Sequence, residues 1–417
     1  MKVFKFGGAS VKDAQAIKNL TAILSDYRGL ELIIVISAMG KTTNKLEEII
    51  KSHNSEDGRH DQLIDSLKKE HQSVIEELAL EEITSLSVEL DALFTSLSQA
   101  LENLSENKFQ QYDAIVSVGE LLSTKIISHY LISQGFEAEW VDARELIKTN
   151  DAFNEAKIDW PLTQHLMQQS LANKSLSKWP VTQGFIGSTL GGQTVTLGRE
   201  GSDFSAAVFA YSLNAEEVII WKDVPGILNA DPKKIEDALL IEQMSYEEAG
   251  EMTYYGAKVI HPKTMRPLAH KSIPLRVRSF EDTHQPGTLI SSKQSTTPYS
   301  SIIFNTNQLL ISFRQREFSF IDEKTLGLIF HSLDQLNVKI NLMQNSATSF
   351  SICMDYHQFK LNRLFEVLSD QFEIQYNEGL TLLTLNNYKP DTVGKLISDK
   401  ELILEQKSRK TAHYVYR

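Results

Sequence analysis

Glycine is concentrated in one short segment of the chain, where it can bring the backbone close to a ligand. The chain has 20 glycines among 417 residues, and six of them fall between residues 184 and 201. The last one, Gly201, leads into Ser202 and Asp203, which begin a predicted helix. A helix N-terminus presents free N–H groups and the positive end of a dipole, and both suit a phosphate. On glycine density alone, a hairpin followed by an ordinary helix cap remains the alternative.

A second cluster stands at the start of the chain, in Lys5-Phe6-Gly7-Gly8-Ala9-Ser10. A short apolar strand runs into a glycine pair and a predicted helix, with a lysine just before the turn. This arrangement can place one ammonium and several backbone N–H groups on an anion. It matches neither the Walker A sequence nor the GxGxxG fingerprint. Gly40-Lys41-Thr42 is not a P-loop either, because Val35 occupies the place of the first glycine.

Two more clusters follow predicted strands, at the edge where parallel sheets bind ligands. Residues 37–44 contain Thr43 and other small hydroxyl side chains that can hold a carboxylate or a phosphate. Ser117-Val118-Gly119-Glu120 ends in a carboxylate that can accept hydrogen bonds from a substrate ammonium. The alternatives are a polar turn in the first case and a favourably placed acidic helix start in the second.

Basic residues supply the remaining candidates. Lys222-Asp223 follows the apolar run at 218–221, and Lys233 and Lys258 stand further along the chain. Lys233 and Lys258 can contact nucleotide phosphates, although a lone lysine is more often a solvated charge. His261 has no visible metal-ligand or triad partner in the sequence, which predicts a structural role.

The first 280 residues alternate apolar runs with helical patterns, which favours a largely parallel sheet between helices. The predicted strands cover 32–36, 114–118, 140–141, 194–197, 218–221 and 274–277. The predicted helices cover 11–24, 119–133, 202–213 and 245–256, with an exposed helical hairpin inserted over 55–107. Ser10 with Asp13, and Ser245 with Glu248, have the spacing of capping boxes.

The pattern changes after residue 280. Residues 281–300 have the composition of a linker. Beyond them, strands are predicted over 309–313, 338–343, 349–354 and 380–385, and helices over 323–336 and 358–368. Residues 342–346 are repeated weakly at 404–408, and a β-prone run follows each copy, which predicts two related small α+β modules.

Composition excludes several classes of protein. The 42 basic and 54 acidic residues give a net charge of −12, which disfavours a general binder of nucleic acid or of anionic membranes. No apolar run approaches the ~20 residues of a membrane span. The single cysteine, Cys353, lies in an apolar run and is predicted to pack in a core. A chain without disulfides and without a secretory signal is expected in the cytoplasm.

Taken in order, these clusters resemble aspartokinase, the aspartate-specific branch of the amino-acid-kinase family. The motifs are Lys-Phe-Gly-Gly, Ser-Ala-Met-Gly with Thr-Thr-Asn, Ser-Val-Gly-Glu, Gln-Gly-Phe-Ile-Gly-Ser, Thr-Leu-Gly-Arg-Glu-Gly-Ser-Asp, Asp-Val-Pro-Gly-Ile and Gly-Ala-Lys-Val-Ile-His-Pro. The resemblance implies a three-layer αβα catalytic domain over 1–291, with an aspartate-binding and an ATP-binding part. A linker over 292–306 and tandem ferredoxin-like ACT modules over 307–417 would follow. No dehydrogenase domain is expected after them, as in the monofunctional enzymes.

The resemblance implies phosphorylation of the β-carboxylate of L-aspartate by MgATP. The product would be 4-phospho-L-aspartate, the first intermediate towards lysine, methionine, threonine and diaminopimelate. The nucleophile is already ionised at pH 7, so no general base is needed, and charge neutralisation is the main task. Mg²⁺ would be held largely by phosphates and water, as this ion prefers.

Roles for single residues also come from the resemblance. The catalytic residues would be Lys5 on the transferring phosphate and Asp203 as the organiser of the centre. The aspartate-binding residues would be Thr43, Glu120, Phe185, Arg199 and Ser202. The nucleotide-binding residues would be Lys5, Phe6, Gly7, Gly8, Lys222, Asp223, Leu228, Lys233, Lys258 and Val259. Asn341 and Ser346 would border a regulatory site for an effector such as lysine or threonine. No residue is expected to bind a metal ion directly.

The chain departs from the family pattern at several positions. In the catalytic part, Ala9 replaces a Thr or Ser, Glu200 a common Gly, Lys222 a Thr or Ser, and Leu228 an aromatic residue. In the regulatory part, Asn341 and Ala347 replace the Asp and Glu of many lysine-inhibited relatives, which weakens the expectation of lysine inhibition.

The chain ends at Arg417, before the expected last helix and strand of the second module. That module would be degenerate or completed by a partner chain, and a homodimer through the ACT modules is expected. Two other functions stay open on the sequence: a kinase of another amino acid such as glutamate or acetylglutamate, and a catalytically silent amino-acid sensor.

Overall fold

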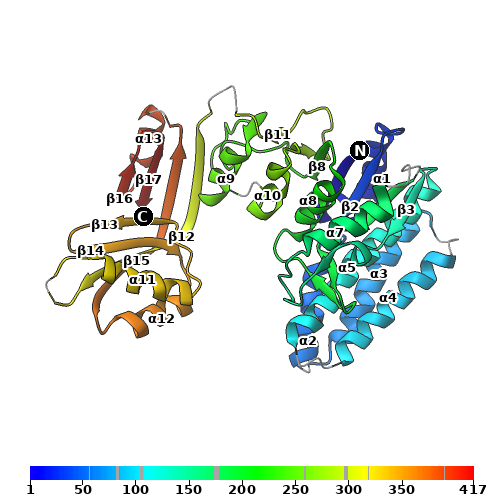
Figure 1. The fold of residues 1–417 in the computed structure, drawn as a ribbon, viewed down its shortest axis with the longest axis horizontal. Coiled ribbons are helices and arrows are strands. Elements are labelled where there is room, and N and C mark those ends of the chain that lie inside the picture. The colour runs from blue at the N-terminus through cyan, green and yellow to red at the C-terminus, as the bar shows by residue number, and fades with distance from the viewer. Residues whose placement is uncertain are drawn as a thin grey trace. The chain divides into compact units, whose positions relative to one another are not determined.

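The computed structural model describes residues 1–55, 57–80, 84–103, 107–172, 178–257, 260–294, 299–317, 319–388 and 390–417. The chain forms two compact units (Figure 1). The first contains Met1–Ile227, Leu240–Gly250 and Val259–Thr296, and the second contains Leu228–Leu239, Glu251–Lys258 and Thr297–Arg417. Two short segments of the first 260 residues therefore pack with the C-terminal part of the chain.

An eight-stranded sheet forms the centre of the first unit. Its order is β3 (Ala138–Val141), β5 (Trp179–Gln183), β2 (Leu32–Ile36), β1 (Lys2–Phe6), β8 (Glu217–Lys222), β10 (Leu275–Ser279), β11 (Thr288–Ser291) and β9 (Gln243–Ser245). Every neighbouring pair is parallel except β10 with β11. The predicted largely parallel sheet is confirmed. β11 lies inside the stretch 281–300 that was expected to be a linker, so that expectation is wrong for residues 288–291.

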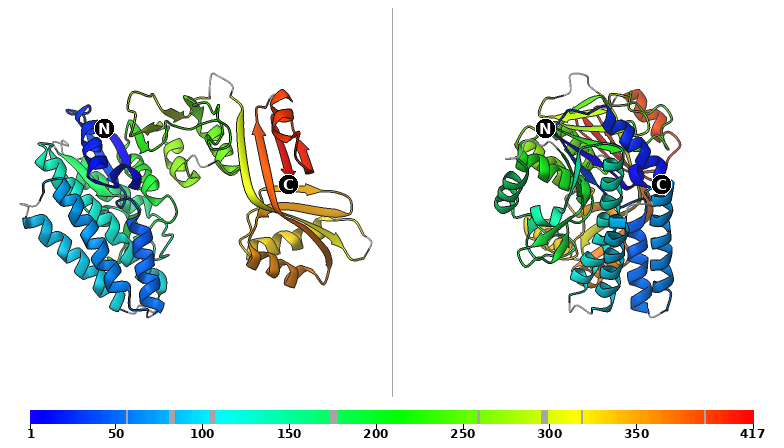
Figure 2. Two further views of the ribbon diagram at one scale, coloured as in Figure 1. Left: turned by 180° about the vertical axis from the view of Figure 1, so that it is seen from behind. Right: turned by 90° about the vertical axis from the view of Figure 1, so that its right-hand side faces the viewer.

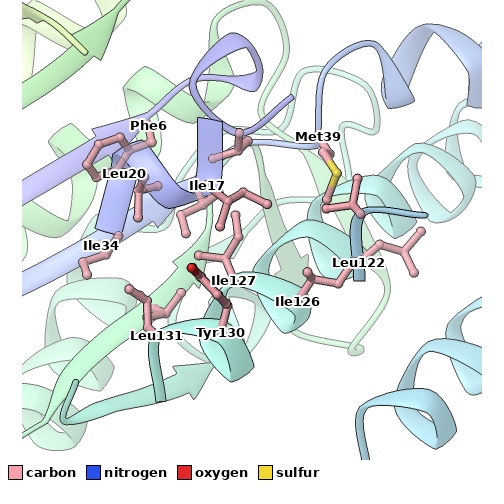
Figure 3. Packing of buried hydrophobic residues seen from close by; sticks show 14 of the residues in the cluster. Phe6, Ile17, Leu20, Ile34, Met39, Leu122, Ile126, Ile127, Tyr130 and Leu131 are labelled. Carbon is pink, nitrogen blue, oxygen red and sulfur yellow. The ribbon is translucent and has the colours of Figure 1, made fainter. Parts of the chain in front are cut away.

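Helices cover both faces of this sheet. On one face lie α1 (Ala14–Ser25) and α5 (Lys108–Ser133), and on the other lies α8 (Gly201–Leu213), which contacts β1, β2 and β8. Figure 3 shows the first of these interfaces, where Phe6 and Ile34 of the sheet lie in one buried cluster with Ile17 of α1 and Ile127 of α5. Because side chains alternate along a strand, Lys5 points to the opposite face, towards α8.

Further helices complete the unit (Figure 2). α2 (Thr42–Ser55) and α4 (Thr84–Glu102) pack on α5, and α3 (His60–Glu77) packs on α2. The Lys68–Asp91 ion pair and the His71–Phe94 ring contact join α3 to α4, which confirms the predicted helical hairpin. α7 (Trp160–Met167) and α10 (Pro262–His270) pack on α8. A small sheet of β4 (Lys148–Thr149), β6 (Ile186–Thr189) and β7 (Thr194–Thr196) follows the one-turn helix α6 (Ala143–Leu146). η2 (Gln168–Ala172) continues α7.

The predicted strand at 114–118 is wrong, because these residues belong to α5. Most of α5 is buried, and a helix that is apolar on all sides has no amphipathic period to distinguish it from a buried strand. By length and composition α5 could also cross a membrane, but 83% of its most apolar window is buried inside the protein. It is the central helix of this unit.

Helix starts show one confirmed and one wrong prediction. Before α9 (Tyr246–Tyr254), the Ser245 N–H donates to Glu248 at 2.7 Å and the Glu248 N–H donates to the Ser245 hydroxyl at 3.1 Å, which is the predicted capping box. At α1 the cap is Asp13, which accepts the Ala16 N–H at 2.8 Å. Ser10 lies in the short 3₁₀ turn η1 (Gly8–Val11), and its hydroxyl donates to the Trp221 carbonyl.

The second unit contains a six-stranded antiparallel sheet. Its order is β13 (Leu342–Asn345), β14 (Ser349–Asp355), β12 (Ser301–Gln315), β15 (Phe372–Asn386), β17 (Thr411–Tyr416) and β16 (Leu402–Lys407). Its helices are α11 (Glu323–Gln335), α12 (Gln358–Leu368) and α13 (Pro390–Ile397). The predicted repeat corresponds to the hairpins β13–β14 and β16–β17, one at each end of the sheet. β13 starts at Leu342, four residues later than predicted.

The long strands β12 and β15 each serve two modules. The second half of β12 and the first half of β15 pack with α11 and α12 in one core cluster. The first half of β12 and the second half of β15 pack with β17 and α13 in a separate core cluster. The pairing of Ser301 with Asn386 places the start of β12 beside the end of β15. The first residues of β12 therefore belong to the second module, although they come before the rest of both modules in the sequence. Ala230, Ile235 and Ala238 of the segment Leu228–Leu239 pack against this second core.

Candidate active site

A cavity of about 710 Å³ lies in the first unit where β1, β2, β5 and β8 end. The carboxyl ends of parallel strands are the usual ligand site of an open α/β sheet. Eleven of the residues predicted for the site line this cavity: Lys5, Gly7, Gly8, Thr43, Glu120, Phe185, Arg199, Ser202, Asp203, Lys222 and Asp223. Segments separated by up to about two hundred residues thus meet at one place.

Two lysines share one carboxylate at the base of the cavity. Lys5 Nζ lies 2.7 Å from Asp203 Oδ1, and Lys222 Nζ lies 3.4 Å from Asp203 Oδ2. Burial opposes ionisation of Asp203, but the two ammonium groups outweigh it and hold the pKa of this carboxyl below its ordinary value. The cluster carries two positive charges and one negative charge, so it suits an additional anion.

Glu120 brings a second buried carboxylate into the cavity. Its side chain accepts a hydrogen bond from the Ala38 backbone, while Oε2 has no hydrogen-bond partner. Burial raises the pKa of Glu120 to about 8, although Lys5 opposes this shift. A buried carboxylate oxygen without a donor is costly, so this position is suited to a ligand that brings a donor, above all a cationic one.

The turn after β5 packs directly against the start of α8. Phe185 has a φ of +70°, and its N–H donates to the Ser205 hydroxyl at 2.9 Å. A Cβ on Gly184 would lie 2.5 Å from Ser202 Cβ, so only glycine allows this approach. α8 has no side-chain cap at Glu200, which leaves its first-turn N–H groups directed at the cavity.

Gly184→Ala is expected to lower the free energy of unfolding by about 1–3 kcal/mol, because the new methyl group pushes the first turn of α8 away from β5. Urea denaturation followed by far-ultraviolet circular dichroism measures this. Gly191→Ala is the matched control in the same glycine-rich segment, since its Cβ would meet no atom closer than 3.7 Å. Equal stabilities of the two variants would contradict the close-packing argument.

Arg199 lies between two residues of left-handed backbone, Gly198 at φ +72° and Glu200 at φ +54°. Within the described part of the chain, its guanidinium forms no ion pair.

Glu200, which replaces a glycine of the family pattern, accepts the His261 backbone N–H at 3.0 Å. His261 in turn caps α10, where its Nδ1 accepts the Lys263 N–H at 3.2 Å, so its predicted structural role is confirmed.

Other predicted residues lie elsewhere. The Phe6 ring is in the core, stacked on Trp221 with 5.9 Å between ring centroids. Leu228 and Lys233 belong to the second compact unit, and Lys258 and Val259 lie outside the described residues.

The two predicted regulatory residues also belong to the second unit. The Asn341 amide donates to Gln308 at 2.8 Å and to Asp355 at 3.0 Å, and the Ser346 and Ser349 hydroxyls are 2.8 Å apart. The amide of Asn341 is therefore already engaged within the sheet.

Three residues that line the cavity, Tyr112, Asn154 and Glu155, were not predicted from the sequence. Tyr112 is on α5, two residues before the stretch 114–118 that was wrongly predicted as a strand, and its hydroxyl donates to Glu47 at 2.7 Å. A correct assignment of α5 would have placed Tyr112 two turns from Glu120. Asn154 and Glu155 lie in a polar loop with no motif, and only the fold brings them to the site.

Comparison with known proteins agrees with this geometry. Residues 1–279 match the amino acid kinase family. The lysine-sensitive aspartokinase 3 of Escherichia coli (strain K12) is 31% identical over 92% of this chain and 86% of that protein. The chloroplastic bifunctional aspartokinase/homoserine dehydrogenase 2 of Arabidopsis thaliana is 27% identical over 90% of this chain, which spans only 42% of that protein.

A solved structure gives the same result in three dimensions. The crystal structure of E. coli aspartokinase III in complex with aspartate and ADP (R-state) superposes with a TM-score of 0.84 at 27% identity, over 100% of this chain and 96% of that one. Sequence and fold agree over both compact units, and the predicted αβα domain followed by ACT-like modules is confirmed. The chain belongs to the amino acid kinase family and, within it, to the aspartokinases.

Proposed function

We propose that this chain transfers the γ-phosphoryl group of ATP to the β-carboxylate of L-aspartate, giving 4-phospho-L-aspartate and ADP. One observation carries the proposal. A buried carboxylate oxygen without a partner, on Glu120, and an arginine without an ion pair among the described residues, Arg199, line the same cavity as the Lys5–Asp203–Lys222 cluster. A free α-amino acid would bring an ammonium for Glu120 and a carboxylate for Arg199, and a phosphate would bring negative charge to the two lysines.

The amino acid is proposed to bind at its α-carbon groups. The Arg199 guanidinium would hold the α-carboxylate in a bidentate pair, and Glu120 would accept the α-ammonium. Thr43 and Ser202 would orient the β-carboxylate, with Phe185 as the apolar wall. The pairing of Glu120 with an ammonium favours a free amino acid over an N-acetylated one.

Phosphoryl transfer in this site needs charge neutralisation more than proton transfer. The β-carboxylate is ionised at neutral pH, so it attacks without a general base. The two reacting groups repel each other as anions. Lys5, the N–H groups at Gly7 and Gly8 and the N-terminus of α8 would reduce this repulsion, while Asp203 keeps Lys5 in place.

The nucleotide is proposed to extend from Lys5 towards Lys222 and Asp223, which line the same cavity. Contacts of the nucleotide with Leu228, Lys233, Lys258 and Val259 stay predictions from the sequence. Mg²⁺ would enter with ATP and neutralise its phosphates, held mainly by phosphate oxygens and water. Among the described residues, no group of three His, Cys, Asp or Glu side chains is arranged to hold a metal ion. The enzyme is proposed to work in the cytoplasm.

The C-terminal part is proposed to regulate the enzyme. Residues 1–291 would be catalytic, 292–306 would connect, although β12 already begins at Ser301, and 307–417 would be regulatory. An amino-acid effector such as lysine or threonine would bind near Asn341 and Ser346, and two copies of the chain would associate through these modules. Sedimentation of the protein as a monomer at all concentrations would contradict the dimer.

The direct test is ADP release from MgATP with L-aspartate, L-glutamate and N-acetyl-L-glutamate in parallel, with hydroxylamine to trap an acyl phosphate as the hydroxamate. We expect hydroxamate with aspartate only. Turnover with another substrate would move the specificity and keep the reaction class. No turnover with any of the three would favour an amino-acid sensor. Adding lysine, threonine or both tests regulation in the same assay.

The binding of aspartate is expected to tighten as the pH rises from 6.5 to 8. With its pKa raised to about 8, Glu120 is mostly protonated below that pH in the free enzyme, and only the ionised form pairs with the α-ammonium. The KM for aspartate should therefore fall by up to about tenfold per pH unit and level off above pH 8. Glu120→Gln should raise this KM and abolish its slope, and an unchanged slope in that variant would assign the titration to another group.

A further inference from the structure

Asp113 is a buried carboxylate that the proposed reaction does not use. It lies on α5 with 0% of its surface exposed. Within the described part of the chain it forms no ion pair, although a fully buried carboxylate is normally paired with a cation. It accepts three hydrogen bonds instead. Oδ2 accepts the N–H groups of Asn154 and Thr196, both at 2.8 Å, and Oδ1 accepts the Thr196 hydroxyl at 2.7 Å.

The two segments that Asp113 holds form one wall of the cavity. Asn154 and Glu155 line the cavity on one segment, and Gly198 and Arg199 line it just beyond Thr196 on the other. The segments touch, because a Cβ on Gly198 would lie 3.1 Å from Glu155 Cγ and 3.4 Å from the Asn154 carbonyl. The Ala156 N–H also donates to the Thr196 carbonyl at 3.0 Å. One carboxylate thus ties α5 to both segments of this wall, the Asn154 loop and β7.

Arg199 depends on this wall for its position. Its side chain has no ion-pair partner among the described residues, and its backbone lies between two left-handed residues. Among the described residues, no hydrogen bond or ion pair holds the guanidinium, so its place is set by the backbone that leaves β7 at Thr196. Asp113 holds that backbone at Thr196, three residues before the arginine.

We propose that Asp113 is a positioning residue for substrate binding: by tying the Asn154 loop and β7 to α5, it sets the place of Arg199 for the α-carboxylate of the substrate. The inference rests on the proposed function, in which Arg199 binds that group. A displacement of about 1 Å at such a position can cost up to about a hundredfold in rate.

Three variants that keep or remove different hydrogen bonds of Asp113 can distinguish a positioning role from a role in core packing alone. In Asp113→Asn, the amide oxygen can take the place of Oδ2 and keep both N–H donors, while the NH₂ group donates to the Thr196 hydroxyl. In Asp113→Leu, two backbone N–H groups and one hydroxyl lose their acceptor. In Thr196→Val, only the hydroxyl bond is lost.

The test measures kcat and KM for aspartate and for ATP in the wild type and these variants. We expect Asp113→Leu to raise the KM for aspartate about tenfold or more with the KM for ATP within about twofold, Thr196→Val to raise it about threefold, and Asp113→Asn to stay within about twofold. Hydrogen exchange of the amides at 154 and 196 should be faster in Asp113→Leu and unchanged in Asp113→Asn.

Ile115→Ala is the matched control, since Ile115 is buried in the core on the same helix and does not line the cavity. It should lower stability without raising the KM for aspartate.

The outcomes separate this inference from the proposed function. If the wild type is active and Asp113→Leu keeps the wild-type KM for aspartate, this inference is overturned and the proposed function stands. The same holds if Ile115→Ala raises that KM as much as Asp113→Leu does. If Asp113→Leu does not fold, an unchanged KM in Thr196→Val overturns it. If the wild type has no activity on aspartate, the proposed function fails and this inference fails with it.

Discussion

Replacing Lys5 by alanine is expected to reduce kcat by about 10²–10³-fold with the fold preserved, because removing one preorganised donor from a developing charge has this cost. The Lys5 ammonium lies at the end of β1 beside the Gly7–Gly8 turn, where the transferring phosphoryl group would carry its charge. Lys222, the other lysine of the cluster, approaches the opposite oxygen of Asp203. The measurement is aspartate-dependent hydroxamate formation under saturating MgATP.

The fold should survive this substitution because Asp203 keeps a cation. Breaking a buried ion pair outright costs about 3–5 kcal/mol, but Lys222 remains 3.4 Å from Oδ2, so we expect a smaller loss of stability. Lys2→Ala is the matched control on the same strand. Lys2 Nζ lies 2.8 Å from Glu217, which retains Arg276 at 2.8 Å when Lys2 is removed. Turnover of Lys5→Ala equal to that of Lys2→Ala would exclude Lys5 from the transfer step.

The sequence was most informative where one strand or one cap carried the signal. The run at 32–36 became β2 with the predicted bounds, and the reciprocal bonds of Ser245 and Glu248 followed from spacing alone. Most of the charged and glycine-rich motifs also met in one cavity, because they stand at the end of a parallel strand or the start of a helix. Glu120 is the exception, since it reaches the cavity from the middle of α5.

The sequence was least informative where burial is complete or a contact is remote. The apolar run at 114–118 has no hydrophobic periodicity, so the sequence does not distinguish a buried helix from a buried strand there. Because the run was predicted as a strand, Tyr112 and Asp113 were not recognised as residues of the same helix as Glu120. The pairing of the start of β12 with β15 could not be predicted either, since β12 is far from that module in sequence. Asn154 and Glu155 lie in a loop that contacts α5 through the bond from the Asn154 N–H to Asp113, a contact that no local sequence pattern indicates.

Arg199→Lys is expected to raise the KM for aspartate by about tenfold to a hundredfold with a smaller change in kcat. A guanidinium donates two parallel hydrogen bonds to a carboxylate, whereas an ammonium is a point charge that keeps the attraction and loses the fork. A hydrogen bond to a charged group contributes about 1.5–3 kcal/mol, and 1.4 kcal/mol is tenfold in an equilibrium constant, so the loss of one bond accounts for this range. Arg199→Ala removes both bonds and the charge, and should raise the KM further.

The contrast between kcat and KM decides the role of Arg199. If the guanidinium binds the α-carboxylate, which does not react, it holds the ground state and the transition state alike, so the defect must appear in KM and be overcome by excess aspartate. A defect in kcat that persists at saturation would instead place Arg199 on the phosphoryl group, beside Lys5. Arg276→Ala is the control, because that arginine pairs with Glu217 away from the cavity and Glu217 retains Lys2. The two arginines carry the same charge, so a KM effect confined to position 199 must come from the cavity and not from the net charge of the protein.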